Sequence, residues 1–265
     1  MQSKPIWDYI FFGTSLRYLQ DAKEGMPAHG AGYASDNIES FFDQLQDFGL
    51  PVTERAAYEL AQFRDEIAKS DDDHTLSSDE ARRLGDVMND VRKTCEAEAK
   101  GKVAFIVTDK RIDVRKLLSD VRGLMAPDVF DSLPDIAQYD LMEAGKCIAF
   151  ERPTAGAFHL LRATEAVLRH FYCSVVHRNR AELMWGPMVK SLRERRSPPA
   201  SELLDNLDNI RRSFRNPTQH PDKIYDIQEV QDLFGLCTDV INRMARAPQW
   251  TAPVMSTYAS ASCDA

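Results

Sequence analysis

The spacing of apolar positions along the chain is helical almost throughout. Before residue 100, four stretches repeat an apolar residue every three or four positions: 5–19, 35–50, 53–69 and 77–99. The last stretch begins at Ser77, and Glu80 follows three residues later, which is the spacing of a capping box. We therefore predict that residues 1–125 form a mainly helical N-terminal domain.

Only one stretch has the character of a β-strand. In KVAFIVTD, residues 102–109, a run of β-branched and aromatic residues is closed by Asp109. A single strand specifies no sheet, so we expect at most a minor β element. Asp113 then has the position of an N-cap for a helix over 111–125, and the Pro-punctuated segment that follows predicts a domain boundary near residue 126.

The C-terminal half predicts a simpler architecture of amphipathic helices joined by short loops. The expected helices cover 135–151, 154–176, the surroundings of 182–196, 198–214 and 226–244. The last starts with Asp226 and Glu229 at capping-box spacing. Helices of this length with short connections form an up-and-down bundle, which we place at 126–247. The fold class is thus mostly α, with 248–265 as a disordered tail rich in Ala, Ser and Thr.

Composition narrows the class of protein. The chain has 265 residues, 43% of them hydrophobic, and begins without a basic leader; nowhere do about 18 apolar residues follow one another. We expect a cytoplasmic protein without a membrane partner. Five cysteines, an odd number, lie far apart without a CxxC pair. This predicts neither disulfides nor a zinc site, and we expect no metal and no other cofactor.

The net charge of −8 is unevenly distributed. Residues 1–100 carry 11 Lys/Arg against 20 Asp/Glu, whereas residues 151–223 carry 13 against 8. An acidic half therefore precedes a locally basic one. The acidic half is open to several hypotheses: it covers or mimics RNA at a basic site, it senses a partner, or it extends a dimer.

The basic segment contains RNPTQH, residues 215–220, between two predicted helices. On a continuous helix Arg215 and His220 would point roughly 140° apart. Pro217 lacks an amide hydrogen and disfavours a helical conformation at the preceding residue. We therefore predict that the helix stops near Asn216 and that His220 lies in an irregular turn, which can bring the two side chains together at one end of the bundle.

The helix predicted over 154–176 has two distinct faces. The core face is expected to consist of six residues: Leu160, Leu161, Thr164, Val167, Leu168 and Phe171. On the other side His159, Arg162, Glu165 and Arg169 fall within about 120°. Such a face is either solvated or functional; in the second case the carboxylate of Glu165 would orient an Arg or His from elsewhere in the bundle.

RNPTQH fits the R-x4-H signature, with a polar residue after the Arg, of the HEPN superfamily of helical bundles. The segment AGKCIAFERPTAGAFHLLRATEAVLRHF resembles the first core helices of a bacterial branch of that superfamily, and RNPTQHPDKIYDIQEV resembles its terminal region. The resemblance covers roughly residues 130–247. Many members are metal-independent endoribonucleases that act as dimers, with the Arg and His of both chains in one cleft.

The resemblance implies that Arg215, Asn216 and His220 are catalytic, with Glu165 in a supporting position. Arg162, from the same polar helix face, and Tyr225, downstream of the motif, are further supporting candidates. The 2′-hydroxyl of RNA would attack the adjacent phosphorus, giving a 2′,3′-cyclic phosphate and a free 5′-hydroxyl. His220 would transfer a proton, and Arg215 would stabilise the added negative charge. Five further arginines would contact RNA phosphates: Arg193, Arg195, Arg196, Arg211 and Arg212.

The implied partners are RNA, a second copy of the chain and a regulatory protein, and the implied role is a toxin or antiphage defence effector. Two other interpretations stay open. The domain is a non-catalytic module that binds nucleotides, other ligands or proteins, since a fold does not settle a function. Alternatively, RNPTQH is merely a helix-ending turn.

Overall fold

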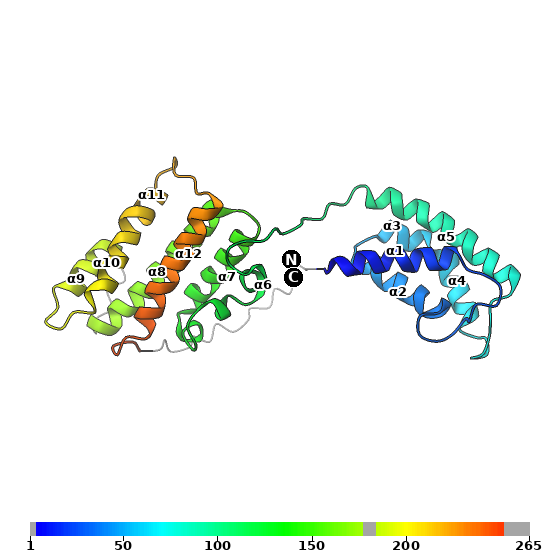
Figure 1. The fold of residues 1–265 in the computed structure, drawn as a ribbon, viewed down its shortest axis with the longest axis horizontal. Coiled ribbons are helices and arrows are strands. Elements are labelled where there is room, and N and C mark those ends of the chain that lie inside the picture. Colours follow the sequence, from blue (N-terminus) through cyan, green and yellow to red (C-terminus); the bar gives the residue numbers. More distant parts are fainter. Residues whose placement is uncertain (1–3, 177–183, 252–265) are drawn as a thin grey trace, which may run out of the picture. The chain divides into compact units, whose positions relative to one another are not determined.

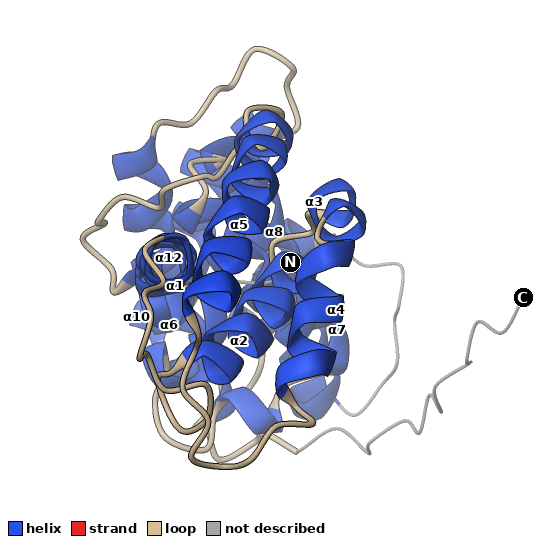
Figure 2. Ribbon diagram, turned by 90° about the vertical axis from the view of Figure 1, so that its right-hand side faces the viewer, coloured by secondary structure: helices blue, strands red, loops and turns tan. Residues whose placement is uncertain are grey.

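The computed structural model describes residues 4–176 and 184–251, and the chain divides into two compact units, Met1–Phe105 and Ile106–Ala265. The predicted mostly helical fold class is confirmed. The described residues form helices and loops, and the β pairing among them is an isolated bridge between Pro27 and Thr75 (Figure 2). Within this part of the chain no helix combines the length and apolarity needed to cross a bilayer.

The N-terminal unit is built from five helices around one apolar core (Figure 1). These are α1 (Ile6–Gln20), α2 (Ala34–Asp47), α3 (Pro51–Ala56), α4 (Tyr58–Ile67) and α5 (Ser78–Ala99). The predicted capping box is present: the Ser77 side chain accepts from the backbone N–H of Glu80, whose carboxylate accepts from the N–H of Ser77. α1 packs on α2 and α5, and the apolar stripes predicted from the sequence meet in the core.

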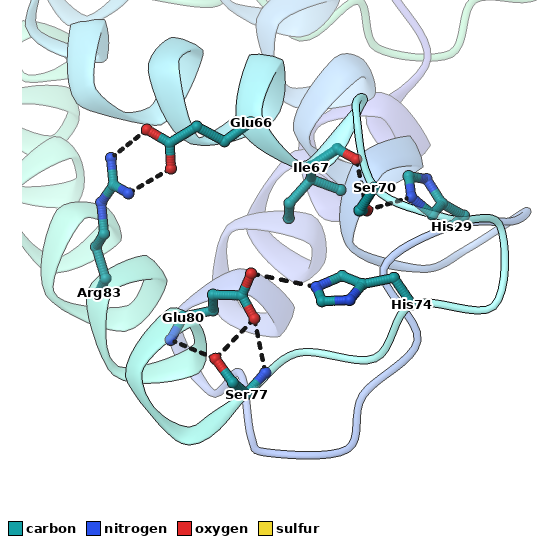
Figure 3. A network of polar contacts seen from close by, with 8 residues as sticks. All are labelled: His29, Glu66, Ile67, Ser70, His74, Ser77, Glu80 and Arg83. Atoms are coloured by element: carbon teal, nitrogen blue, oxygen red, sulfur yellow. Dashed lines mark hydrogen bonds and ion pairs between the residues drawn. The ribbon is translucent and has the colours of Figure 1, made fainter.

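A polar network joins the start of α5 to its neighbours (Figure 3). The capping carboxylate Glu80 also contacts His74 Nε2 at 3.2 Å, and Arg83 forms a two-pronged ion pair with Glu66 of α4. Figure 3 shows His74, Ser77 and Glu80 meeting at the start of α5, with the pair Glu66–Arg83 apart from them between α4 and α5. The acidic residues here serve helix capping and inter-helix contacts.

The predicted strand over 102–109 is wrong. Residues 102–110 are not assigned to a strand, and Val103, Phe105 and Ile106 are exposed to 86%, 85% and 81%. β-branched and aromatic residues favour an extended conformation only where a neighbouring strand satisfies their backbone groups and packs their side chains. Here no such partner strand is described, and the segment connects the two units.

The boundary between the units lies about twenty residues before the predicted one. α6 (Val114–Ser119), capped by Asp113 as predicted, and the 3-10 turn Val121–Leu124 pack against α7 (Asp135–Ala149) in the C-terminal unit. Leu117 and Val121 are buried in that unit's core. Burial of these two apolar residues, rather than the later Pro-rich segment, determines where the second unit begins.

The C-terminal unit is a helical bundle with α8 at its centre (Figure 1). α8 (Pro153–Val176) packs along α7 and α12 (Ile227–Ala245), while α9 (Trp185–Arg193) and α10 (Ser201–Ile210) complete the unit. The six residues predicted for the core face of α8 are all buried, and the Asp226–Glu229 capping box of α12 is present. The helices thus follow the predicted order.

The sequence predicts a disordered tail over residues 248–265, but Trp250 and Thr251 contact α8. The Trp250 ring lies edge-on to His170 of α8 at a centroid distance of 4.6 Å, and His170 Nε2 is 2.6 Å from the carbonyl oxygen of Thr251. The remainder of the predicted tail, residues 252–265, lies outside the described residues.

A close backbone approach between α6 and α7 generates a stability prediction. A Cβ added at Gly145 would lie 2.4 Å from the carbonyl oxygen of Leu117, so Gly145→Ala forces the two helices apart. We expect a loss of about 1–3 kcal/mol in the free energy of unfolding, the range typical of overpacking. The measurement is urea unfolding followed by circular dichroism.

Gly235 in α12 is the matched control, because an added Cβ there meets nothing within 4 Å. Gly235→Ala should stabilise the unit by about 0.5–1 kcal/mol through helix propensity. Equal unfolding midpoints for Gly145→Ala and the wild type would contradict the packing argument.

Candidate functional site

The helix that carries RNPTQH ends at Thr218, two residues beyond the stop predicted near Asn216, and His220 lies in the turn that follows, as predicted; Asn216, however, is still helical. α10 runs into a π-helical turn, Arg211–Arg215, and then into α11, Asn216–Thr218. Asn216 is helical, with φ −66° and ψ −49°, and its N–H donates to the carbonyl of Arg211, five residues earlier. A π turn spaces its hydrogen bonds by five residues and so makes room for the Pro217 ring, which would otherwise clash with a carbonyl four residues back.

The π turn places Arg215 against the polar face of α8. Arg215 Nη2 lies 3.5 Å from Glu165 Oε2, while the other carboxylate oxygen of Glu165 accepts from Arg169 at 2.8 Å. The Arg215 side chain is 25% exposed and that of Glu165 18%. The contact expected of Glu165, with an arginine from elsewhere in the bundle, is therefore present; at 3.5 Å it is a long contact, and it engages Arg215 through Nη2.

A second polar cluster surrounds a carboxylate of α7. The Asp140 side chain has no exposed surface and accepts hydrogen bonds from His159 Nδ1 at 2.9 Å and from Arg162 Nε at 2.6 Å and Nη2 at 2.5 Å. The hydrogen bond with Asp140 raises the pKa of Arg162. A buried carboxylate requires such partners because desolvation penalises its charge. The three side chains join α7 to α8.

The two clusters border one cavity of about 230 Å³. Its lining consists of residues from α8, from the π turn and from the short segment after that turn: Phe158, His159, Leu161, Arg162, Glu165, Arg215, Thr218 and Gln219. The volume is below the roughly 300–1,000 Å³ of typical small-molecule sites, so the cavity suits a small ligand or one segment of a longer one. Two guanidinium groups and an imidazole share its wall with one carboxylate, that of Glu165, and this excess of donors favours an anionic ligand.

The remaining residues of the predicted catalytic set lie outside the cavity lining. His220 and Asn216 are exposed, and the backbone N–H of His220 donates to the carbonyl of Pro217 at 2.9 Å. The structure thus brings Arg215, Arg162 and Glu165 together, but not Asn216 and His220 with them.

Tyr225 has a position typical of a structural residue. It is buried; its hydroxyl is 2.6 Å from the Thr218 hydroxyl and donates to the carbonyl of Phe214, and its N–H donates to Thr154. Burial raises the pKa of Tyr225. The side chain therefore attaches the loop after RNPTQH to the π turn and to the start of α8, and it does not line the cavity.

The arginines predicted to contact RNA are separate from the Arg215 cavity. Arg193 and Arg211 line a different, open groove of about 720 Å³ between α9 and α10. Arg193 is paired with Asp205, and Arg211 and Arg212 with Asp208.

Arg195 donates to the carbonyl of Val175, and Arg196 is exposed. Most of these cations are thus already engaged locally, and their role in RNA binding stays a prediction.

Comparison of the chain with protein-family models, with curated proteins and with solved structures found no match. The HEPN resemblance accordingly rests on the sequence motifs alone.

Asp140 is the site residue that the sequence interpretation missed. A signal was present: Ala137, Asp140, Leu141, Ala144 and Ile148 share one face of the predicted helix, so Asp140 is a carboxylate within an otherwise apolar stripe. His159 was recognised on the polar face of α8 without being assigned a role. Gln219 carried no signal beyond its place in RNPTQH.

Because the Asp140 carboxylate is buried, we expect removal of its partner Arg162 alone to destabilise the fold more than removal of both charges. Arg162→Met keeps the apolar stem but removes two donors from Asp140, leaving a buried charge with one hydrogen bond, and should cost about 3 kcal/mol of unfolding free energy. Combining it with Asp140→Asn removes the charge as well, so the double variant should be more stable than Arg162→Met alone. Urea unfolding of both variants measures the difference.

Arg243→Met is the control, since Arg243 pairs with Asp239 in an exposed i,i+4 contact on α12. It should change stability by less than about 1 kcal/mol. If Arg162→Met is as mild as Arg243→Met, the buried pair does not hold α7 to α8.

Proposed function

We propose that the C-terminal unit is a HEPN-type domain and that the protein is a metal-independent endoribonuclease. The observation that carries the proposal is the position of Arg215: the arginine of the R-x4-H motif lines a cavity together with Arg162, His159 and Glu165. The π turn that places it there is a further support, because such turns occur frequently at functional sites.

Arg215 suits the binding of a phosphodiester. Its guanidinium is permanently charged and presents a planar set of donors to phosphate oxygens. Its one described ion pair, to Glu165, is at 3.5 Å, so a phosphate would compete with a long contact rather than a short one. In the transition state, where the phosphorus carries an additional oxygen, the same charge stabilises the added negative charge.

The proposed active site is composite and needs a second copy of the chain. His220 is exposed and lies outside the cavity lining of its own chain, so it is available to the cavity of a partner. The apolar patch that we propose as the dimer surface consists of four exposed residues: Ile136, Tyr139 and Met142 of α7 and Phe158 of α8. Phe158 also lines the cavity, and Tyr139 is close enough to Arg162 to influence its pKa. Two such patches in contact would form a symmetric dimer.

A second candidate function is non-catalytic binding of a nucleotide or another phosphate-bearing ligand. The separation of His220 from the Arg215 cavity favours it, because a binding site needs no proton-transfer group. In that case phosphate-bearing ligands raise the melting temperature, Arg215→Ala removes the shift, and no RNA is cut.

The nuclease proposal predicts cleavage of single-stranded or loop RNA in the presence of EDTA, with 2′,3′-cyclic phosphate and 5′-hydroxyl ends. Arg215→Ala should lower kcat/KM by about 10²-fold or more, the size of effect expected for loss of a group that stabilises transition-state charge. The products are identified by sequencing RNA ends. The control variant Arg243→Ala, on α12 outside the cavity, should cleave like the wild type.

The composite site predicts complementation between two inactive variants. When Arg215→Ala and His220→Ala chains are mixed and allowed to exchange, half of the dimers are mixed, and one of their two sites combines an intact Arg with an intact His. Activity should therefore return to about a quarter of the wild-type value in a symmetric dimer. A mixture as inactive as its components, or a monomer in light scattering, contradicts the composite site.

A further inference from the structure

His159 lines the cavity in an orientation determined by a buried group. Its Nδ1 is 2.9 Å from Oδ1 of Asp140, whose side chain has no exposed surface, while the imidazole itself is 27% exposed. Within the described part of the chain, the other ring nitrogen, Nε2, makes no hydrogen bond. The ring is thus fixed at Nδ1, is partly exposed, and belongs to a residue that lines the cavity.

The hydrogen bond also specifies which nitrogen carries the proton in the neutral ring. Arg162 donates two hydrogen bonds to Asp140, so this carboxylate is an acceptor, and His159 must donate to it through Nδ1–H. Nε2 is then the unprotonated nitrogen, with a lone pair able to accept a proton. His159 therefore combines an imidazole held at Nδ1 with a position on the wall of the cavity that Arg215 also lines.

Cleavage by 2′-hydroxyl attack needs two proton transfers. The O2′–P bond forms as a base takes the proton from the 2′-hydroxyl, and the P–O5′ bond breaks as an acid gives a proton to the leaving O5′. No water, metal or redox partner is consumed in this step. In each composite site as proposed above, one His220 meets one Arg215 and supplies a single proton-transfer group, so the reaction needs a second group.

We propose that His159 is the general base that accepts the 2′-hydroxyl proton at Nε2, that Asp140 positions it, and that His220 supplies the acid. This inference rests on the proposed endoribonuclease function and deepens it. Arg162 assists indirectly, because its two hydrogen bonds keep Asp140 in the accepting state that orients the imidazole.

The test uses substrates with different leaving groups and a variant that keeps the contact with Asp140. In His159→Asn the side-chain amide nitrogen replaces Nδ1 as a donor to Asp140, but no group replaces Nε2. The substrates are a dinucleoside monophosphate and uridine 3′-(4-nitrophenyl phosphate), whose nitrophenolate leaves without a proton. Loss of a base affects both substrates, whereas loss of an acid affects only the dinucleotide.

We expect His159→Asn to lower kcat by about 10²–10⁴-fold on both substrates, the usual range for removal of a general base. His220→Ala should lose activity on the dinucleotide and retain it on the nitrophenyl ester. Asp140→Asn should lower kcat on both substrates with little change in KM, on the order of 100-fold, because the imidazole is no longer held in the required tautomer. Circular dichroism and melting temperature show that each variant is folded.

His170→Ala is the control, since His170 is on the same helix but contacts Trp250 and Thr251 instead of the cavity. It should leave both activities unchanged.

Full activity of His159→Asn on both substrates would overturn the inference and leave the nuclease proposal intact. Recovery of His159→Asn on the nitrophenyl ester alone would also overturn it, because His159 would then be the acid. If the wild-type protein cleaves neither substrate nor longer RNA, the proposed function fails, and the assignment of His159 fails with it.

Discussion

The arrangement of the C-terminal unit depends on the burial of one carboxylate. Asp140 has no contact with solvent, and a charge in that environment is tolerated only when donors surround it. All the donors described come from two residues of α8, three positions apart on one face of that helix. The pairing therefore fixes how α8 is turned relative to α7. Because α8 also carries the buried core face and Glu165, one ionic contact orients both the packing and the cavity wall.

A second constraint comes from Pro217. A proline in a regular helix loses a hydrogen bond and clashes with the preceding turn, and here the backbone widens into a π turn instead of ending. The helix continues through Thr218, and Tyr225 holds the following loop against the turn. Arg215 then faces Glu165 of α8, whereas His220 emerges after the helix has ended. The proline thereby separates the two motif residues into one that lines the cavity and one that is exposed.

The charge of the basic segment is a poor guide to where an anion would bind. Arg193, Arg211 and Arg212 are paired with aspartates close to them in the chain or on the next helix, and Arg193 and Arg211 line a different groove. The cavity holds fewer cations, but they are organised by buried or half-buried carboxylates. Local geometry, more than the count of basic residues, decides which guanidinium groups can meet a ligand.

Local rules were sufficient to predict much of the fold from the sequence. The capping boxes at Ser77 and Asp226, the Asp113 cap and the core face of α8 depend on residues within a few positions of one another, so their patterns specify them. The strand at 102–109 was predicted wrongly because a strand requires a partner elsewhere in the chain, and no partner strand is described. The unit boundary was misplaced because Leu117 is apolar in either domain, and only packing on α7 assigns it.

The candidate site likewise contains some features that local sequence patterns specify and others that depend on contacts between distant residues. The sequence by itself determined that an arginine and a histidine flank Pro217, and that Glu165 lies on the polar face of a long helix. Only the tertiary structure decided that Arg215 reaches Glu165, that Asp140 orients His159, and that His220 stays outside. The reason is that contacts between residues 19 and 50 positions apart depend on how the helices are turned and spaced relative to one another. Desolvation of the Asp140 carboxylate and the steric demand of the Pro217 ring decide that arrangement, and both act between elements rather than within one local pattern.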